Sequence, residues 1–409
     1  MFIFHEHLGV GMKHLFKLLW ANICLVLSAG GYNPVLLVIG TRPEGIKMMP
    51  VYQALQKLNI PTLLCSTDQH AELLKDDVLK IFNIKPDISF NIMKPGQDLF
   101  YITTSVLEKM KETLQTLQPS MVVVQGDTTT AMAAALAAFY LKIPIGHIEA
   151  GLRTGNKYGP FPEEINRTII DILADFHFAP TDHSAHSLLE QGIKKENIYV
   201  TGNTVVDALY FIRASNHTNR NYSFPIQQVI SEAKKNNKKL LLLTAHRRES
   251  FNGGLLEIFS AIKEILLLHP ELFIIYPIHP NPSIKKALQE STLDTMPNIF
   301  ITNPLEYTDL VYLLDAIDMV ATDSGGIQEE AVSLGKPVLI LRNETDRPEG
   351  VNAGLARLVG TNREIIIREI SLLMTQTPHF DTTTVYGDGT AGVKIATIIK
   401  KFLKKENNE

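Results

Sequence analysis

The sequence predicts an α/β protein built on two doubly wound parallel sheets. Three observations support this fold class. Short apolar runs rich in β-branched residues alternate with amphipathic helical segments, which is the pattern of parallel βαβ units. The apolar runs contain few polar residues, as expected for strands that are buried on both faces of a sheet. A long polar stretch interrupts the alternation once, after which it restarts, and this indicates two domains.

The predicted elements follow one another from residue 34 onwards. Strands are expected in the first half at residues 35–39, 61–65, 121–124, 143–148, 176–179 and 198–200. The helices between them are expected at residues 46–58, 72–82, 98–117, 128–141, 163–174 and 182–191. In the second half, strands are expected at residues 240–244, 273–278, 299–301, 319–322 and 338–341. Each half therefore reads as one Rossmann-like domain.

The polar stretch at residues 213–239 places the domain change just before it. We expect an N-terminal extension at residues 1–33, a first Rossmann-like domain at 34–203, a second at 204–390, and a C-terminal helix at 391–409 that packs back on the first domain. Ligands of such sheets bind beyond the carboxyl ends of the strands. The two domains are therefore expected to face each other across a cleft at these ends.

The N-terminal extension has three interpretations. Lys13, His14 and Lys17 precede an apolar run at residues 18–29, which resembles the charged and hydrophobic parts of an export signal. The run is too short to span a membrane comfortably. An extension from an upstream start codon and a peripheral packing helix are the other two interpretations. No later part of the chain requires export.

The composition excludes several classes of protein. With 409 residues, of which 45% are hydrophobic, the chain is long enough for two domains with full cores. The net charge of −4 gives no indication of a nucleic-acid partner, and no membrane partner is expected. Cys24 and Cys65 form neither a disulfide framework nor a metal-ligand spacing, which favours a reducing cytoplasm.

The segment from Asp318 to Glu330 is the strongest candidate for ligand binding. A short apolar run breaks at Ser324, Gly325 and Gly326 into a predicted helix. Adjacent glycines let a ligand approach the backbone, and the exposed N–H groups and the helix dipole favour a phosphate there. Glu330 falls one turn into the helix, within reach of a ribose attached to that phosphate. An ordinary tight turn is the alternative interpretation.

Carboxylates follow two strands of the first half. Asp127 follows the strand at 121–124, and Glu149 follows the next strand, at 143–148. Glu163 and Glu164 open the helix after that. Helix capping is the alternative for Asp127, and Glu164 is expected to be only a partner of the helix dipole.

Basic residues follow strands in both halves. Arg42 and Lys47 come after the first strand, where a solvated helix start is the alternative. His246 follows the strand at 240–244 beside arginine, an arrangement that suits a diphosphate or a leaving-group oxygen. Arg347 follows the last strand among acidic residues, so that an ion pair is its alternative.

Taken together, these segments resemble the non-hydrolysing UDP-N-acetylglucosamine 2-epimerase family. The motifs occur in family order from about residue 34 to the C-terminus. They are Gly40-Thr41-Arg42-Pro43-Glu44, Gly126-Asp127-Thr128-Thr129, His147-Ile148-Glu149-Ala150-Gly151-Leu152-Arg153-Thr154, Phe161-Pro162-Glu163-Glu164-Ile165-Asn166-Arg167, Thr244-Ala245-His246-Arg247-Arg248-Glu249 and Asp323-Ser324-Gly325-Gly326-Ile327-Gln328-Glu329-Glu330.

The resemblance implies a two-domain fold of the glycosyltransferase-B type and a homodimer. It also implies interconversion of UDP-N-acetylglucosamine and UDP-N-acetylmannosamine by anti elimination of UDP to 2-acetamidoglucal and syn readdition, which would supply precursors for cell-surface polysaccharide. Neither a cofactor nor a metal is implied. By the same resemblance, the family's catalytic positions fall on Asp127, Glu149, Glu163 and His246. Its UDP-sugar contacts fall on Arg42, Lys47, Ser324, Gly325, Gly326, Glu330 and Arg347.

Two enzymes of the same fold remain alternatives at this point: a retaining UDP-sugar glycosyltransferase and a hydrolysing 2-epimerase that releases free N-acetylmannosamine. A catalytically inactive UDP-sugar sensor is a third. The chain also departs from the family at Ala71, where members activated by a second UDP-N-acetylglucosamine carry arginine after Gln69-His70. The resemblance therefore does not extend to that activation.

Overall fold

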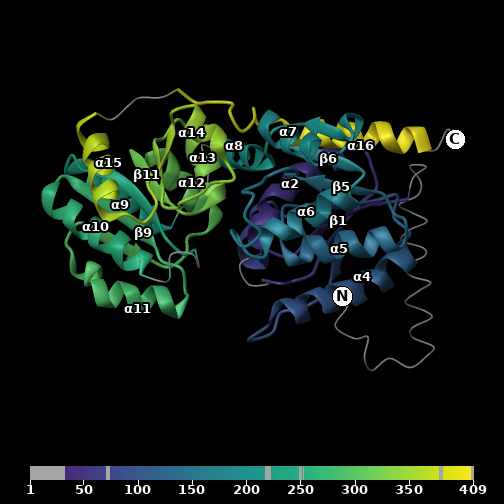
Figure 1. Cartoon of the computed structure of the whole chain (residues 1–409), viewed down its shortest axis with the longest axis horizontal. Coiled ribbons are helices and arrows are strands. Elements are labelled where there is room, and N and C mark those ends of the chain that lie inside the picture. The colour runs from purple at the N-terminus through teal and green to yellow at the C-terminus, as the bar shows by residue number, and fades with distance from the viewer. Residues whose placement is uncertain are drawn as a thin grey trace. The chain divides into compact units, whose positions relative to one another are not determined.

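A computed structural model of the chain describes residues 33–70, 74–216, 223–247, 251, 253–376 and 381–406. Residues 1–32 of the predicted extension and Ala71 lie outside this range. The chain divides into two compact units (Figure 1). Unit 1 consists of the described residues up to Ala208 together with those from Gly387 onwards, and unit 2 is Leu209–Tyr386.

Unit 1 contains a parallel sheet whose strands lie in the order β3-β2-β1-β4-β5-β6-β7. Its strands are β1 (Val35–Ile39), β2 (Thr62–Ser66), β3 (Ile88–Ser89), β4 (Met121–Gln125), β5 (Ile145–Ile148), β6 (Phe176–Ala179) and β7 (Ile198–Val200). Its helices are α2 (Arg42–Lys57), α4 (Leu99–Leu117), α5 (Thr129–Tyr140), α6 (Glu163–Leu173), α7 (Asp182–Glu190) and α16 (Ala391–Glu406), together with a π-helix at Leu74–Leu79 and a 3₁₀ turn at Lys195–Asn197. Helix α8 (Thr204–Asn216) contains the boundary between the units.

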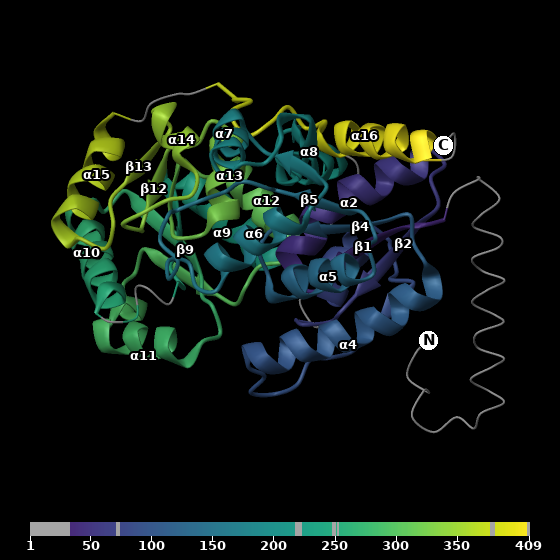
Figure 2. The same cartoon turned by 45° about the vertical axis from the view of Figure 1, so that its right-hand side comes forward.

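The two faces of this sheet are covered by different helices. Side chains of β1 and β4 that point to one face form a core with α4 and α5, and α6 packs beside α5. Helix α16 packs along α2, as both views show (Figure 2). A methyl group on Gly392 would lie 2.8 Å from the backbone of Pro50, so the glycine allows this close approach. The C-terminal helix is thereby part of unit 1.

Unit 2 contains a second parallel sheet, in the order β10-β9-β8-β11-β12-β13. Its strands are β8 (Lys239–Thr244), β9 (Leu272–Pro277), β10 (Ile299–Thr302), β11 (Met319–Thr322), β12 (Val338–Ile340) and β13 (Ala356–Leu358). Its helices are α9 (Phe224–Lys235), α10 (Gly254–Leu268), α11 (Pro282–Ser291), α12 (Tyr307–Ala316), α13 (Gly325–Ser333), α14 (Pro348–Asn352) and α15 (Arg363–Thr375), with a 3₁₀ turn at Leu293–Thr295. Alternate residues of β8 explain the layering, because Leu241 and Leu243 join the core beneath α10, α11 and α15 while α9 and α12 pack against the strand as well.

The predicted fold class is confirmed. Every predicted strand is present, and the ends differ from the prediction by at most two residues. The short edge strands β3 and β13 were missed. Within the predicted helix at 72–82, the structure describes a π-helix at Leu74–Leu79. No helix among the described residues has the length and apolar character needed to cross a membrane.

Candidate active site

Both sheets reverse their strand order beside their first strand. Strand β1 lies between β2 and β4, and β8 lies between β9 and β11. In doubly wound sheets, ligands bind at this reversal, beyond the carboxyl ends of the strands. The predicted site residues follow these strands and their neighbours. Each unit therefore has its own group of predicted residues at the carboxyl ends of its strands. In unit 1 the set is Arg42, Lys47, Asp127, Glu149 and Glu163, and in unit 2 it is His246, Ser324, Gly325, Gly326, Glu330 and Arg347.

Glu149 is the most constrained of the predicted residues. Its φ angle is 67°, which is unusual for a residue with a side chain. The backbone N–H groups of Glu149 and Ala150 both donate to the Phe178 carbonyl, at 3.0 and 3.2 Å. The buried carboxylate accepts hydrogen bonds from Lys47 Nζ and Gln125 Nε2. Strain of this kind is concentrated at functional sites.

Lys47 is itself buried, in the second turn of α2. The family resemblance assigned it to the nucleotide sugar, whereas in the structure it forms an ion pair with Glu149. The two predicted site residues of β1–α2 and β5 are thereby brought into direct contact. Removing either one alone would leave a charge or donor in a buried position.

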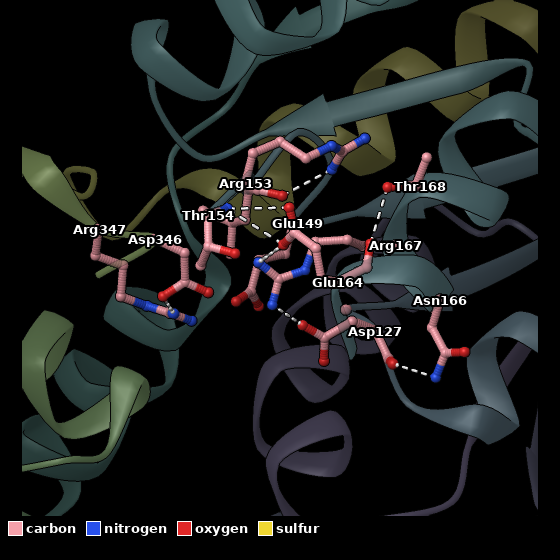
Figure 3. A network of polar contacts seen from close by, with 12 residues as sticks. Asp127, Glu149, Arg153, Thr154, Glu164, Asn166, Arg167, Thr168, Asp346 and Arg347 are labelled. Atoms are coloured by element: carbon pink, nitrogen blue, oxygen red, sulfur yellow. Dashed lines mark hydrogen bonds and ion pairs between the residues drawn. The ribbon is translucent and has the colours of Figure 1, made fainter. Parts of the chain in front are cut away.

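Asp127 lies between β4 and α5 and does not cap the helix. Thr128 caps α5 instead, because its hydroxyl accepts from the Ala131 N–H at 3.0 Å. The Asp127 carboxylate forms an ion pair with Arg167, and its carbonyl accepts from Asn166 Nδ2 at 2.9 Å (Figure 3). The capping alternative is therefore wrong, and Asp127 keeps a partly exposed carboxylate beside a cation from α6.

Glu163 and Glu164 begin α6, but they differ in environment. Glu163 is half-buried at the first position of the helix. Glu164 is buried, and its carboxylate accepts from the backbone N–H groups of Thr154 and Gly155, at 3.1 and 3.0 Å (Figure 3). The expectation that Glu164 is only a dipole partner was incomplete, because it also holds the loop that follows β5.

Arg42 is the first residue of α2, and the carboxylate nearest to it in sequence is Glu44. Glu44 accepts from Thr41 N at 2.7 Å, Thr41 Oγ1 at 2.8 Å and Thr128 Oγ1 at 2.7 Å. Burial raises the pKa of Glu44 to about 7, against the effect of these donors. Glu44 was not among the predicted site residues, although the Thr-x-x-Glu spacing of a capping box is present in the sequence.

In unit 2, Asp323 holds the residues that follow β8. Its carboxylate accepts from the backbone N–H groups of His246 and Arg247, at 2.5 and 2.7 Å, and lies 3.1 Å from His246 Nδ1. Although burial opposes it, the interaction with His246 holds the pKa of Asp323 below its usual value. The His246 side chain is 31% exposed, and its ring stacks on His279 with 5.6 Å between centroids. Asp323 thus orients an accessible imidazole.

The predicted phosphate-binding site lies at the start of α13. Ser324 is the N-cap, and Gly325 and Gly326 are the first helical residues. A methyl group on Gly325 would lie 2.5 Å from the guanidinium of Arg347, whereas one on Gly326 would meet no heavy atom within 4 Å. A side chain at position 325 would therefore have to displace the Arg347 guanidinium, whereas position 326 is open.

Glu330 and Arg347 are both buried among polar partners. Glu330 accepts from the Tyr307 hydroxyl at 2.7 Å. Arg347 donates through Nε to Glu329 at 2.8 Å and through Nη1 to Asp346 at 2.6 Å. The ion-pair alternative for Arg347 is thus present in the structure. Because Arg347 also packs on Gly325, it lies at the start of α13, next to the predicted phosphate-binding site.

Comparison with known proteins identifies the family. A family model described as UDP-N-acetylglucosamine 2-epimerase matches residues 53–400. The UDP-N-acetylglucosamine 2-epimerase of Campylobacter jejuni is 45% identical over 382 residues, which are 92% of this chain and 98% of that protein. The enzyme of the same name from Escherichia coli K12 is 44% identical over 377 residues, covering 90% and 98%.

Solved structures agree with this result. The UDP-GlcNAc 2-epimerase of Neisseria meningitidis, bound to UDP-GlcNAc, superimposes with a TM-score of 0.84 at 43% identity, covering 90% of this chain and 100% of that one. The Methanocaldococcus jannaschii UDP-GlcNAc 2-epimerase, in complex with UDP-GlcNAc and UDP, gives a TM-score of 0.79 at 34% identity, covering 90% and 99%. The chain belongs to the UDP-N-acetylglucosamine 2-epimerase family.

Proposed function

We propose that this chain is a non-hydrolysing UDP-N-acetylglucosamine 2-epimerase, an isomerase that interconverts UDP-N-acetylglucosamine and UDP-N-acetylmannosamine. The observation that carries the proposal is the match at 45% identity to a named epimerase across 98% of that protein. The reaction changes only the configuration at C2, without net oxidation or reduction. Anti elimination of UDP and syn readdition transfer a proton and UDP but no hydride, so the proposed route uses no nicotinamide cofactor, and its residues are assigned without a metal.

Unit 2 supplies groups suited to the UDP that leaves. As the bond between C1 and the diphosphate oxygen breaks, negative charge develops on the diphosphate and has to be stabilised. The N-terminus of α13 at Ser324, Gly325 and Gly326 offers backbone N–H groups and a helix dipole for that purpose. His246, oriented by Asp323, is the imidazole assigned to the same oxygen atoms. Arg42 of unit 1, Glu330 and Arg347 complete the proposed nucleotide contacts.

Unit 1 supplies the groups suited to proton transfer at C2. Glu149 and Asp127 each contact a cation, Lys47 and Arg167 respectively. Carboxylates are suitable general bases for abstracting a proton from carbon. Elimination takes a proton from C2 and releases UDP from C1. Readdition delivers a proton to the opposite face of C2 and returns UDP to C1. Glu149 and Asp127 are assigned to the C2 proton, and Glu163 is the additional acid or base.

We also propose a homodimer that acts in the cytoplasm and supplies N-acetylmannosamine precursors for cell-surface polysaccharide. The family resemblance of the sequence motifs implies the dimer and the precursor role, and the cysteine usage favours the cytoplasm. Size-exclusion chromatography with light scattering tests the dimer directly: a mass near twice 45.6 kDa is expected.

The decisive experiment follows C2 by NMR during incubation with UDP-N-acetylglucosamine in D₂O. Deuterium at C2 and a product of manno configuration are expected without any added acceptor. Release of free sugar and UDP would identify a hydrolysing enzyme instead. Conversion that needs an acceptor molecule would identify a glycosyltransferase, and strict dependence on added nicotinamide cofactor or divalent metal would also contradict the proposal.

A further inference from the structure

A buried aspartate of α6 contacts the end of β5 and the loop that follows it. Asp171 is fully buried, and its Oδ1 lies 2.5 Å from Nδ1 of His147, which is also fully buried. Its Oδ2 accepts from Arg153 Nη2 at 2.6 Å and from the Gly151 N–H at 3.2 Å. These partners hold the pKa of Asp171 at about 2, despite burial that acts in the opposite direction. The carboxylate is therefore an acceptor only.

His147 reaches from this carboxylate to the backbone of the neighbouring strand. Its Nε2 lies 2.7 Å from the carbonyl oxygen of Gly126, the residue before Asp127. A carbonyl oxygen can only accept, and the Asp171 carboxylate accepts at the other ring nitrogen. His147 therefore bridges the Asp171 carboxylate and the Gly126 carbonyl through its two ring nitrogens.

The peptide at Gly126 is consequently held from two sides by β5. The Gly126 N–H donates to the Ile148 carbonyl at 2.9 Å, and the Gly126 carbonyl accepts from His147. Gly126 has a φ angle of 68°, so the chain turns sharply there, and this turn sets the direction of Asp127. Ile148 directly precedes Glu149. The same two bonds thus fix Asp127 relative to Glu149.

We propose that His147 is a positioning residue that holds the turn carrying Asp127 in register with the end of β5 carrying Glu149. His147 does not hydrogen-bond to the carboxylate of Asp127 or Glu149, and it acts through the Gly126 carbonyl. The proposal rests on the proposed function, since it assigns both carboxylates to the same proton-transfer chemistry. A displacement of about 1 Å in a reacting group costs on the order of 10²-fold in rate.

His177 provides a matched control. It is paired with His147 in the register of β5 and β6, and it is buried to the same extent. Its Nε2 contacts the Asp171 backbone carbonyl at 2.7 Å, and its Nδ1 contacts the Asn197 carbonyl at 3.2 Å. None of its hydrogen bonds reaches Gly126. Replacing His177 therefore removes a buried histidine from the same cluster without releasing the turn that carries Asp127.

Two substitutions of His147 separate its two hydrogen bonds. The side-chain amide of asparagine reaches the position of Nδ1, and that of glutamine reaches the position of Nε2. His147→Asn therefore keeps the bond to Asp171 and loses the bond to Gly126, whereas His147→Gln does the reverse. We expect kcat on UDP-N-acetylglucosamine to fall about 10²-fold in His147→Asn and less than about 10-fold in His147→Gln, with KM within about threefold in both.

The order of the kcat values among the variants, compared with the order of their unfolding temperatures, distinguishes a positioning role of His147 from a purely stabilising one. His147→Asn retains the charge-assisted bond and should unfold at the higher temperature of the two variants, although it is the slower enzyme. His177→Asn should keep kcat within about twofold of the wild-type value, since its bonds do not support Asp127. Equal kcat in the two His147 variants, or a kcat that follows the unfolding temperature across all three, would overturn the proposal. A wild-type enzyme without epimerase activity would overturn the proposed function instead.

Discussion

Each unit contains a histidine and a buried aspartate at the carboxyl end of its sheet, but the two pairs are used differently. In unit 1 both His147 and Asp171 are fully buried, and the second nitrogen of the ring is occupied by a backbone carbonyl. In unit 2 Asp323 is fully buried, but the His246 side chain is 31% exposed. The buried imidazole can act only on its own backbone, whereas the exposed one is able to meet a ligand. Exposure, rather than the pairing itself, separates the histidine proposed to position the backbone from the histidine proposed to contact UDP.

The carboxyl ends of the two sheets, at the point where the strand order reverses, also differ in charge. The edge of unit 1 presents Asp127 and Glu149, each with a cationic partner, together with the buried Glu44. The edge of unit 2 presents an imidazole and the N-terminus of α13. The same type of sheet thus carries the proposed proton-transfer groups in one unit and the proposed anion-binding groups in the other. The chemistry comes from the residues at the strand ends and not from the fold.

Glu149→Gln gives the largest expected effect and tests whether unit 1 carries the proton chemistry. The amide cannot accept the C2 proton, so kcat should fall by about 10²–10⁴-fold, the usual contribution of a general acid–base group. Binding of UDP, which is assigned to unit 2, should change little. Steady-state kinetics and calorimetric titration with UDP measure the two quantities. A variant with near wild-type turnover would remove Glu149 from the mechanism.

Lys47→Met tests the buried ion pair of unit 1. The substitution leaves the Glu149 carboxylate buried without its cation, which typically costs about 3–5 kcal/mol in the free energy of unfolding. The double variant Lys47→Met/Glu149→Gln should lose less than the sum of the two single variants, because no unpaired charge remains. Urea unfolding followed by circular dichroism measures all three. Additive losses would show that the pair is not energetically coupled.

The fold was predictable because its strands are local apolar runs. The interior strands β1, β4, β8 and β11 each show a continuous run of buried residues, which the sequence displays directly. Strand β13 pairs only with β12, and Arg357 and Leu358 within it are exposed. A three-residue edge strand with one exposed charge has no apolar run to detect. The two-residue strand β3 was missed for the same reason of length.

The strand ends that carry the candidate residues were predictable from the sequence, but the contacts of these residues were not. The rule that ligands bind at strand ends made Asp127 and Glu149 candidates, since it needs only the order of strands along the chain. The partner of Glu149 is Lys47, which lies 102 positions away in the sequence, and no local pattern joins them. The histidine motif His147-Ile148-Glu149 was visible, but the bond from His147 to Gly126 depends on the pairing of β4 with β5.

Gly325→Ala and Gly326→Ala form a matched pair that tests the proposed phosphate-binding site at the start of α13 in unit 2. The methyl group of Gly325→Ala overlaps the Arg347 guanidinium and should displace it from Glu329 and Asp346. Such overpacking costs about 1–3 kcal/mol in the free energy of unfolding. Gly326→Ala meets no heavy atom and replaces glycine in a helix, so its stability should be unchanged or higher by about 0.5–1 kcal/mol.

Affinity for UDP separates the two roles of these glycines. If the diphosphate lies against the first turn of α13, the methyl group of Gly326→Ala should weaken UDP binding even though the protein is not destabilised. Calorimetric titration alongside thermal unfolding gives both values for each variant. Wild-type affinity in Gly326→Ala would show that the phosphate does not lie at that backbone position.

Stability at acidic pH gives the smallest expected effect and compares the two aspartates directly. The pKa of Asp171 is lowered from 3.8 to about 2, so its ionised form stabilises the folded chain above pH 3.8, and this contribution is lost as the pH falls through 2. Asp171→Asn should therefore be less stable than the wild type by roughly 2 kcal/mol near neutral pH, and by about half as much at pH 3.

The pKa of Asp323 is also lowered, so Asp323→Asn should show a difference of the same sign. The two variants should diverge in activity, because only Asp323 orients an exposed imidazole: Asp323→Asn should weaken UDP binding, whereas Asp171→Asn should leave it near the wild-type value. Urea unfolding between pH 3 and pH 8, with UDP titrations at pH 7, measures both, and a stability difference for Asp171→Asn that is as large at pH 3 as at pH 7 would show that its carboxylate is not held by ionic partners.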